Sequence, residues 1–185
     1  MKAGVLALQG DFREHAGAFA ELGAWPVEVR TAEDLSRVDC LAIPGGESTT
    51  ISKLARSAEL VGPIRERALA GMPVLGTCAG MIVMAKLVED GESLLEVMDI
   101  TVRRNAYGRQ VDSFEADVAV DGVEHRVRAV FIRAPMVESV GAGVRVLAEH
   151  EGHPVVLEQG NLVVASFHPE LVGETRLHGY ILGKV

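Results

Sequence analysis

A cysteine between two glycines is the first side chain in this sequence whose surroundings suit covalent chemistry. Residues 76–80 (GTCAG) follow a short apolar run at 73–75 and precede a helical pattern of apolar residues that extends to Val88. A strand that turns sharply into a helix around a nucleophile is a nucleophile elbow, where glycines let neighbouring backbone pass close to a strained residue. The N-terminus of the helix would favour the thiolate of Cys78. The alternative is a small buried side chain, the usual state of a free cysteine, but the flanking glycines favour the elbow.

A histidine and a carboxylate near the end of the sequence can complete a catalytic group with this cysteine. An apolar run at 161–165 leads into His168-Pro169-Glu170. Residues two apart in an extended chain face the same way, so His168 and Glu170 project together if the chain stays extended through Pro169. His168 would accept the thiol proton and later give it to the leaving group, while Glu170 would hold the imidazole in the right tautomer. Without Cys78, such a histidine would be interpreted as a hydrogen-bonded surface residue.

Paired glycines in a second loop suit an oxyanion hole. The loop 44–50 (PGGESTT) ends the apolar run 39–43, and sites in open α/β sheets gather at the carboxyl ends of strands, so we expect the loop beside Cys78. Backbone N–H groups at Gly46 and Ala79 would then receive the oxyanion. The alternative is a tight turn that caps the following helix. The loop lacks the lysine of a phosphate-binding loop, and no dinucleotide-binding glycine pattern follows a strand.

Together these groups predict acyl transfer through a cysteinyl thioester, with no metal and no organic cofactor. Residue types alone leave the identity of the acyl group open. A polar loop at 103–110 carries arginines that could bind a carboxylate, although such loops are usually only solvated. His150 and His153 could bind a metal, but we prefer to interpret them as the solvated tip of a hairpin.

Composition and charge restrict the class of protein. The 185 residues are 48% hydrophobic and 24% charged, which is ordinary for a soluble globular domain with its own core. The net charge of −8 argues against nucleic acid or an anionic membrane as a partner. No segment has the roughly 18 apolar residues of a membrane span, and the first residues lack a signal-peptide pattern. Because Cys40 and Cys78 make no disulfide framework, we expect a cytoplasmic, reducing location with Cys40 packed and inert.

Apolar runs alternate with helical patterns through the first half of the sequence. Continuous apolar runs between helices indicate a parallel sheet covered on both faces, and therefore an α/β fold. From residue 97 onward, short strands separated by turns indicate hairpins that extend this sheet. No linker or repeat divides residues 1–185, which we expect to form a single domain. The expected strands of the first half lie at 3–8, 27–30, 39–43 and 73–75, and the expected helices lie at 12–22, from about 51, and at 81–88.

The motifs described above resemble those of one enzyme family. The elbow GTCAG, the loop PGGES and the ending FHPEL are similar to triad-type class I glutamine amidotransferases, which hydrolyse glutamine and pass ammonia to a synthase. Within that class, the sequence closely resembles the glutaminase subunits of pyridoxal 5′-phosphate synthase. The matching stretches occur in the same order over nearly the whole chain, and RNAYGRQ and FIRAP are more specific than the triad. They are VLALQGDFREH (5–15), PGGESTTI (44–51), GTCAGMI (76–82), RNAYGRQVDSFE (104–115), FIRAP (131–135) and ASFHPEL (165–171).

The resemblance implies a three-layer α/β/α, Rossmann-like domain and roles for single residues. Cys78 would be the nucleophile, with His168 and Glu170 completing the triad. A guanidinium suits the α-carboxylate of glutamine, and a carboxylate or carbonyl suits its α-ammonium. The glutamine would be held by Gly46, Glu47 and Ser48 of the GGES loop, Arg104 of RNAYG, and Ile132 and Arg133 of FIRAP.

The departures from the family pattern are small. Asp11 and Phe12 differ at a motif edge, and Arg103 stands where an acidic residue is common. The triad is unaffected, but which of the two neighbouring arginines binds glutamine stays open.

The implied partner is the barrel-shaped synthase subunit, which uses ammonia to build pyridoxal phosphate from a pentose phosphate and a triose phosphate. Glutaminases of this family are poorly active until the synthase docks and completes the oxyanion hole, so Gly45 and Gly46 are candidates for a switch. L-Glutamine is the implied substrate, and no cofactor, nucleic acid or membrane is implied.

Two other hypotheses keep part of this pattern. A γ-glutamyl hydrolase or a subunit of another amidotransferase would share the triad, but neither explains RNAYGRQ. A non-catalytic regulatory subunit with a redox-sensitive Cys78 would gain nothing from a base and its orienting carboxylate.

Overall fold

The computed structural model describes residues 1–89, 91–104 and 113–185. The RNAYGRQ motif therefore lies outside the described residues except for Arg104, which is included. No helix in the described part of the chain is long and apolar enough to cross a membrane.

Seven strands form the central sheet, in the order β10-β11-β12-β4-β3-β1-β2. The strands β2, β1, β3, β4 and β12 run parallel, and β10 and β11 continue the sheet as an antiparallel hairpin. This arrangement confirms the predicted mostly parallel sheet with an antiparallel extension. The bounds are β1 (Lys2–Leu6), β2 (Trp25–Val29), β3 (Cys40–Ile43), β4 (Val74–Thr77), β10 (Arg145–His150), β11 (His153–Gln159) and β12 (Leu162–Ala165).

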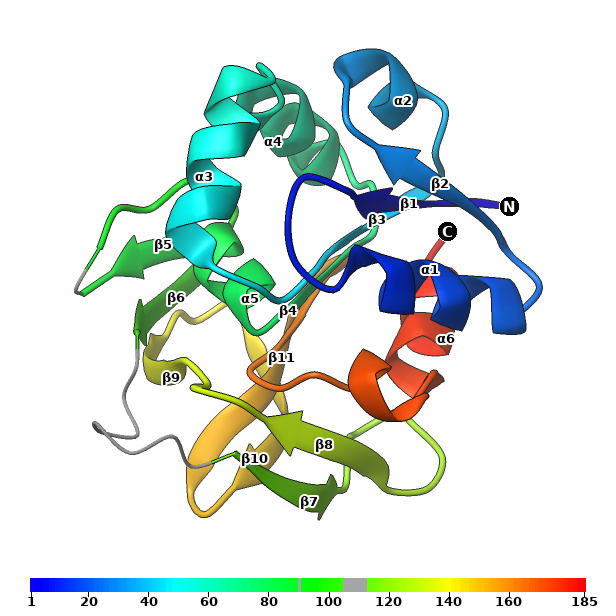
Figure 1. Cartoon of the computed structure of the whole chain (residues 1–185). Coiled ribbons are helices and arrows are strands. Elements are labelled where there is room, and N and C mark those ends of the chain that lie inside the picture. Colours follow the sequence, from blue (N-terminus) through cyan, green and yellow to red (C-terminus); the bar gives the residue numbers. More distant parts are fainter. Residues whose placement is uncertain (90, 105–112) are drawn as a thin grey trace.

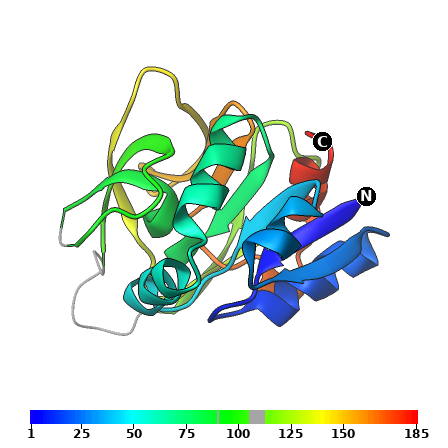
Figure 2. The same cartoon turned by 90° about the horizontal axis from the view of Figure 1, so that it is seen from above.

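Helices cover both faces of this sheet (Figures 1 and 2). Successive side chains of a strand point to opposite faces, and β3 separates two hydrophobic clusters in this way. Leu41 and Ile43 pack with residues of α2 to α5, whereas Cys40 and Ala42 pack with residues of α1 and α6. The three-layer α/β/α prediction is therefore confirmed. The helices are α1 (Phe12–Glu21), α2 (Ala32–Ser36), α3 (Ser48–Ser57), α4 (Val61–Leu69), α5 (Ala79–Met84), α6 (Arg176–Leu182) and the 3₁₀ helix η1 (Glu170–Val172).

Two small sheets lie beside the central one. The first contains β5 (Ala85–Val88), β6 (Met98–Arg103) and β9 (Met136–Val140), and the second pairs β7 (Phe114–Val118) with β8 (Val127–Phe131). The prediction that the late strands extend the central sheet is right for β10 and β11 and wrong for β6, β7 and β8, while β9 was not predicted. Alternating strands such as β6 bury one face whichever sheet they join, so alternation does not specify the pairing partner.

Two predicted boundaries also need correction. The helix expected to reach Val88 ends at Met84, because the next residues leave the helix and pair with β6. The helix expected from about Ile51 begins at Ser48, because the Glu47 carboxylate accepts hydrogen bonds from two N–H groups of its first turn.

The topology gathers four loops at one edge of the sheet. The parallel strands β1, β3, β4 and β12 end there, and the chain order reverses between β1 and β3, with β2 on one side and β4 on the other. Crevices at such switch points are where α/β sheets bind ligands. The segments that leave these four strands are 7–11, 44–47, 78 and 166–169.

Candidate active site

Cys78 lies in the strained elbow that the glycine spacing predicts. It stands between β4 and α5 with φ 46° and ψ −102°, a conformation that non-glycine residues rarely adopt. A Cβ on Gly80 would lie 2.2 Å from the carbonyl oxygen of Ile43, and a Cβ on Gly76 would lie 2.7 Å from Met84 Sδ. Both glycines are thus required by the close packing of β3, β4 and α5, as expected.

His168 and Glu170 form a buried pair. His168 Nδ1 lies 2.9 Å from Glu170 Oε1, and the His168 backbone N–H donates to the carbonyl of Val130 at 2.8 Å. Pro169 has φ −69° and ψ −33°, so the expected extended path through it is wrong. A single 3₁₀ turn, which the fixed φ of proline suits, brings the Glu170 carboxylate to the imidazole instead.

The surroundings of this pair keep it charged. Burial lowers the pKa of His168, but hydrogen bonds with Asp11, Cys78 and Glu170 outweigh burial and raise it from 6.5 to about 12. Burial raises the pKa of Glu170, yet His15 and His168 hold it well below its usual range. At neutral pH the site therefore contains an imidazolium and a carboxylate, with the imidazolium available to stabilise a Cys78 thiolate.

One cavity of about 430 Å³ collects almost all of the residues that the sequence points to. This volume is in the range of about 300–1,000 Å³ that small-molecule sites occupy. Glu170 lies behind His168 rather than on the wall, as an orienting carboxylate should. The lining residues are Gln9, Asp11, Gly46, Glu47, Ser48, Cys78, Ala79, Ile82, Arg104, Ile132, Arg133, His168 and Leu171.

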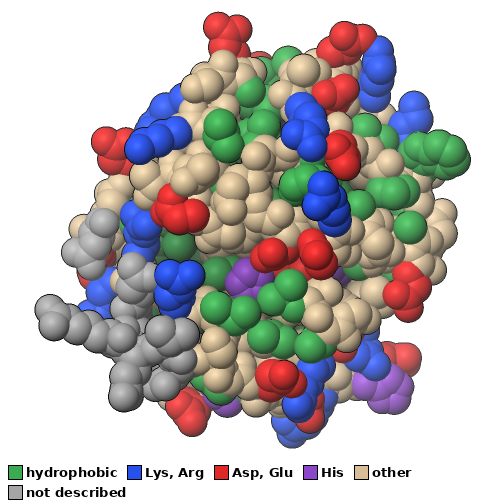
Figure 3. All heavy atoms as spheres, viewed as in Figure 1, with side chains coloured by type: hydrophobic (Ala, Val, Ile, Leu, Met, Phe, Trp, Pro, Cys, Tyr) green, Lys and Arg blue, Asp and Glu red, His purple; other side chains and the backbone are tan. Residues whose placement is uncertain are grey.

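Figure 3 shows one face of the molecular surface. In Figure 3, histidine and acidic side chains lie together at the middle of this face, with hydrophobic side chains beside them.

Glu47 has a structural function in addition to its place at the cavity. Its carboxylate accepts N–H groups of Thr49 at 3.0 Å and Thr50 at 2.7 Å, and Arg104 Nη2 lies 3.2 Å from Oε1. The Thr50 hydroxyl, followed by these backbone donors, lowers the pKa of Glu47 to about 2. Arg103 does not line the cavity and pairs with Glu138 at 2.7 Å. Of the two neighbouring arginines, Arg104 is therefore the one that reaches the site.

Several polar residues at the site were not singled out from the sequence. Asp11 Oδ2 lies 3.3 Å from His168 Nδ1, and Gln9 Oε1 accepts the N–H of Glu47 at 2.8 Å. Both follow β1, and residues at the carboxyl end of β1 are as predictable from the sequence as those of loop 44–50, which follow β3. His15 and His178, which lie behind Glu170, carried no comparable signal because each is an isolated histidine in a helix.

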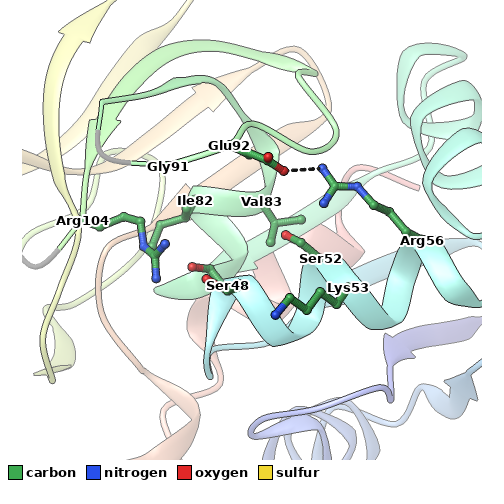
Figure 4. A pocket seen from close by; sticks show the side chains of 10 residues that line it. Ser48, Ser52, Lys53, Arg56, Ile82, Val83, Gly91, Glu92 and Arg104 are labelled. Carbon is green, nitrogen blue, oxygen red and sulfur yellow. Dashed lines mark hydrogen bonds and ion pairs between the residues drawn. The ribbon is translucent and has the colours of Figure 1, made fainter.

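A second cavity, of about 310 Å³, borders the first (Figure 4). Ser48, Ile82 and Arg104 line both cavities. Arg56 pairs with Glu92 across it at 3.1 Å. None of the described residues around it is a cysteine or a histidine, so the covalent chemistry belongs to the first cavity.

The SNO glutamine amidotransferase family matches residues 5–185 of the sequence. The chain belongs to this family. A solved structure described as a glutamine amidotransferase has 47% sequence identity and a TM-score of 0.94, and the match covers 98% of this chain and 97% of that one. The family resemblance expected from the motifs is therefore confirmed.

Two curated members of the SNO glutamine amidotransferase family are similar over nearly their whole length. A protein of Frankia alni named "Pyridoxal 5'-phosphate synthase subunit PdxT" is 55% identical over 181 residues, which cover 96% of this chain and 91% of the relative. A protein of Mycobacteroides abscessus with the same name is 54% identical over 178 residues, covering 95% and 92%. The structure of PurLQS from Thermotoga maritima, at 15% identity and a TM-score of 0.73, shares the fold.

Proposed function

We propose that this chain is the glutaminase subunit of a pyridoxal 5′-phosphate synthase: it hydrolyses L-glutamine to L-glutamate and supplies the ammonia to a synthase subunit. The observation that carries the proposal is a strained cysteine that shares one cavity with His168 and two arginines, in a chain of the SNO glutamine amidotransferase family. The relatives named as pyridoxal 5′-phosphate synthase subunits support the choice of synthase.

The proposed reaction has two steps. The Cys78 thiolate attacks the side-chain carbonyl carbon of glutamine, the C–N bond breaks, and the His168 imidazolium gives its proton to the departing ammonia. Water, deprotonated by His168, then cleaves the thioester to release glutamate and regenerate the thiolate–imidazolium pair. Glu170 orients the imidazole throughout, because its carboxylate accepts the Nδ1 hydrogen.

Backbone N–H groups of Gly46 and Ala79 form the proposed oxyanion hole. Ala79 is the first residue of α5, and N–H groups in the first turn of a helix have no acceptor within it. Gly46 has φ +148°, which an L side chain rarely adopts, and a Cβ there would lie 2.6 Å from Gln9 Oε1. We propose that docking of the synthase adjusts the Gly45-Gly46 segment and thereby activates the site.

The remaining cavity residues are proposed to hold the substrate. Arg104 and Arg133 offer guanidinium groups to the α-carboxylate, and Ile132 contributes its backbone beside Cys78, where its carbonyl lies 3.8 Å from Sγ. Glu47 and Ser48 complete this wall. Because the Glu47 carboxylate caps α3, we expect it to act by holding the loop and Arg104 in place rather than by binding the α-ammonium of glutamine itself.

We also propose that residues 1–185 act as one catalytic domain in the cytoplasm. The nucleophile must remain reduced, and neither Cys40 nor Cys78 forms a disulfide in the structure. A reducing compartment would preserve this state.

The test is glutamate release from glutamine, measured for the chain with and without its synthase subunit. Cys78→Ala should abolish release in both cases. Cys40→Ala is the matched control, because Cys40 is fully buried and burial, followed by Asp39, raises its pKa to about 11. Release that survives in Cys78→Ala would overturn the proposal, and preference for a γ-glutamyl peptide over glutamine would favour the hydrolase alternative. Glutamine hydrolysis by the complex that persists after Cys78 is alkylated would favour the hypothesis of a non-catalytic regulatory subunit with a redox-sensitive Cys78.

A further inference from the structure

Two histidines that the proposed reaction does not use lie directly behind the triad. His15 on α1 and His178 on α6 are both 0% exposed, and neither lines the cavity. The two helices are far apart in the sequence and adjacent in the fold (Figure 1). Buried histidines need partners, because an unsatisfied ring nitrogen in an apolar core is costly.

A hydrogen bond and an ion-pair contact join these histidines to Glu170 in a chain. His178 Nε2 lies 2.8 Å from His15 Nδ1, and His15 Nε2 lies 3.5 Å from Glu170 Oε1. Thr77, the residue before the nucleophile, has its Oγ1 3.0 Å from the same His15 nitrogen. The chain therefore runs from α6 through α1 to the carboxylate that orients His168.

We infer that His15 and His178 are positioning residues of this site: His178 fixes the orientation and tautomer of His15, and His15 presents its Nε2–H to the Glu170 carboxylate. This inference rests on the proposed function of the site.

Hydrogen positions follow from the acceptors around His15. A lone pair on His15 Nε2 would face the Glu170 anion, whereas a hydrogen there faces two acceptors, the carboxylate and the Thr77 hydroxyl. A neutral His15 with its hydrogen on Nε2 accepts at Nδ1 from His178, and a cationic His15 donates to His178 instead. Both arrangements place Nε2–H toward Glu170, and both use the bond to His178 to stop the ring from turning over.

The state of His178 agrees with this assignment. Burial, and then the charge on His15, lowers the pKa of His178 to about 3, while Glu170 and the backbone of Glu174 act in the opposite direction. His178 is therefore neutral, and its ring edge packs on Phe19 with the centroids 5.1 Å apart. A neutral imidazole held by an aromatic ring suits a fixed partner for His15.

Glu170 needs this support because its side chain is fully buried. Its Oε2 has no hydrogen-bond partner among the described residues, so the charge is balanced through Oε1. The charged and titratable groups around it are His15 from α1, His168 from the preceding loop, Asp11 beside His168, and, one residue further out, Cys78 and His178. Of these, only His15 and His168 offer Glu170 a hydrogen directly.

The experiment compares His15→Leu with His15→Gln in the full chain bound to its synthase subunit. Leucine removes the donor, and glutamine keeps an N–H₂ group near the position of Nε2. We expect His15→Leu to lower kcat by about tenfold or more, because the catalytic group that His15 positions is displaced. KM should change little, because His15 does not line the cavity that is proposed to bind glutamine. His15→Gln should recover part of kcat, and His178→Phe should lower kcat in the same direction as His15→Leu.

A second readout does not depend on glutamine hydrolysis. Iodoacetamide alkylates thiolates, so its rate at Cys78, followed by peptide mass spectrometry, reports the thiolate–imidazolium pair. Without His15 the pKa of Glu170 rises, so Glu170 becomes protonated at a higher pH and ceases to support the His168 imidazolium. The acid limb of the alkylation rate should therefore move to higher pH by about one to three pH units in His15→Leu. If wild type fails to hydrolyse glutamine while this shift is present, the proposed function is wrong and the positioning role stands.

Ile64→Val on α4 is a packing control, since Ile64 is buried in the other hydrophobic cluster. It should lower the melting temperature without moving the acid limb. Equal losses of kcat in His15→Leu and His15→Gln, together with an unmoved acid limb, would show a purely structural role and overturn the inference.

Discussion

Replacing Gly45 by alanine should disable His168 while leaving glutamine binding largely intact. A Cβ at this position would lie 2.1 Å from His168 Cε1 and 2.6 Å from Nδ1, whereas ordinary van der Waals contact begins at 3.4 Å. The φ of Gly45 is not in the left-handed region, so alanine fits the backbone itself. The steric overlap that the substitution creates therefore falls on the imidazole ring.

The size of the effect follows from this overlap. To relieve it, the ring must withdraw by about 1 Å or more, and a displacement of that size at a catalytic group can cost roughly 100-fold in rate, or about 2.7 kcal/mol of transition-state stabilisation. Withdrawal is hindered because the backbone N–H of His168 is bonded to Val130 and Nδ1 is bonded to Glu170. Gly45 does not line the cavity, so KM for glutamine should change little.

The assay is steady-state glutamate release by the variant chain with its synthase subunit. Gly17→Ala is the matched control, because Gly17 lies within α1 and a Cβ there would meet nothing within 4 Å. It should stabilise the fold by up to ~1 kcal/mol and leave kcat unchanged. A folded Gly45→Ala variant whose kcat stays within about threefold of wild type, under ~0.7 kcal/mol, would refute the steric argument.

Three further substitutions test the electrostatics of the site. Asp11→Asn should lower the pKa of His168 from about 12 toward 6.5. The contribution of its imidazolium to folding stability is complete below pH 6.5, and in the variant it should be lost at a lower pH as the pH rises. The basic limb of the pH–rate profile should move to lower pH in the same way, and an unchanged basic limb would contradict this. Glu170→Gln should lower kcat by roughly 10²–10⁴-fold with little change in KM, because the carboxylate orients His168 and does not line the cavity; a large loss of glutamine binding would mean it is structural. Glu47→Ala should destabilise the fold by about 1 kcal/mol at neutral pH, since it removes the cap of α3. That difference, measured by urea unfolding, should be present above pH 4.5 and disappear as the pH falls through about 2.

Much of the fold and the triad is encoded in local patterns. The alternation of apolar runs and helices predicts the parallel sheet because each run must be buried on both faces. Gly76 and Gly80 predict the elbow at Cys78 because a Cβ at Gly80 would strike the end of β3 and a Cβ at Gly76 would strike α5. Sites at the carboxyl ends of parallel strands are predictable for the same reason: the topology brings those ends together whatever the intervening helices contain.

Long-range contacts decided what these patterns could not. The strands β6 to β9 form their own sheets because pairing depends on which edges are free in the folded chain, and alternation says only that one face is buried. Glu170 reaches His168 through a turn at Pro169 rather than an extended segment. Arg103 is the last residue of β6 and pairs with Glu138, whereas Arg104, which follows the strand, reaches the cavity.

The environment of the triad shows the same division most clearly. The sequence by itself determined the prediction that Cys78, His168 and Glu170 form a catalytic group, since the residue types and the turn signals around them are local. Only the tertiary structure decided what surrounds Glu170 and His168, because Asp11 comes from a loop at the sheet edge and His15 and His178 come from two helices on one face of the sheet. The charge states of a buried site depend on distances between such segments, and spacing along the sequence does not contain those distances.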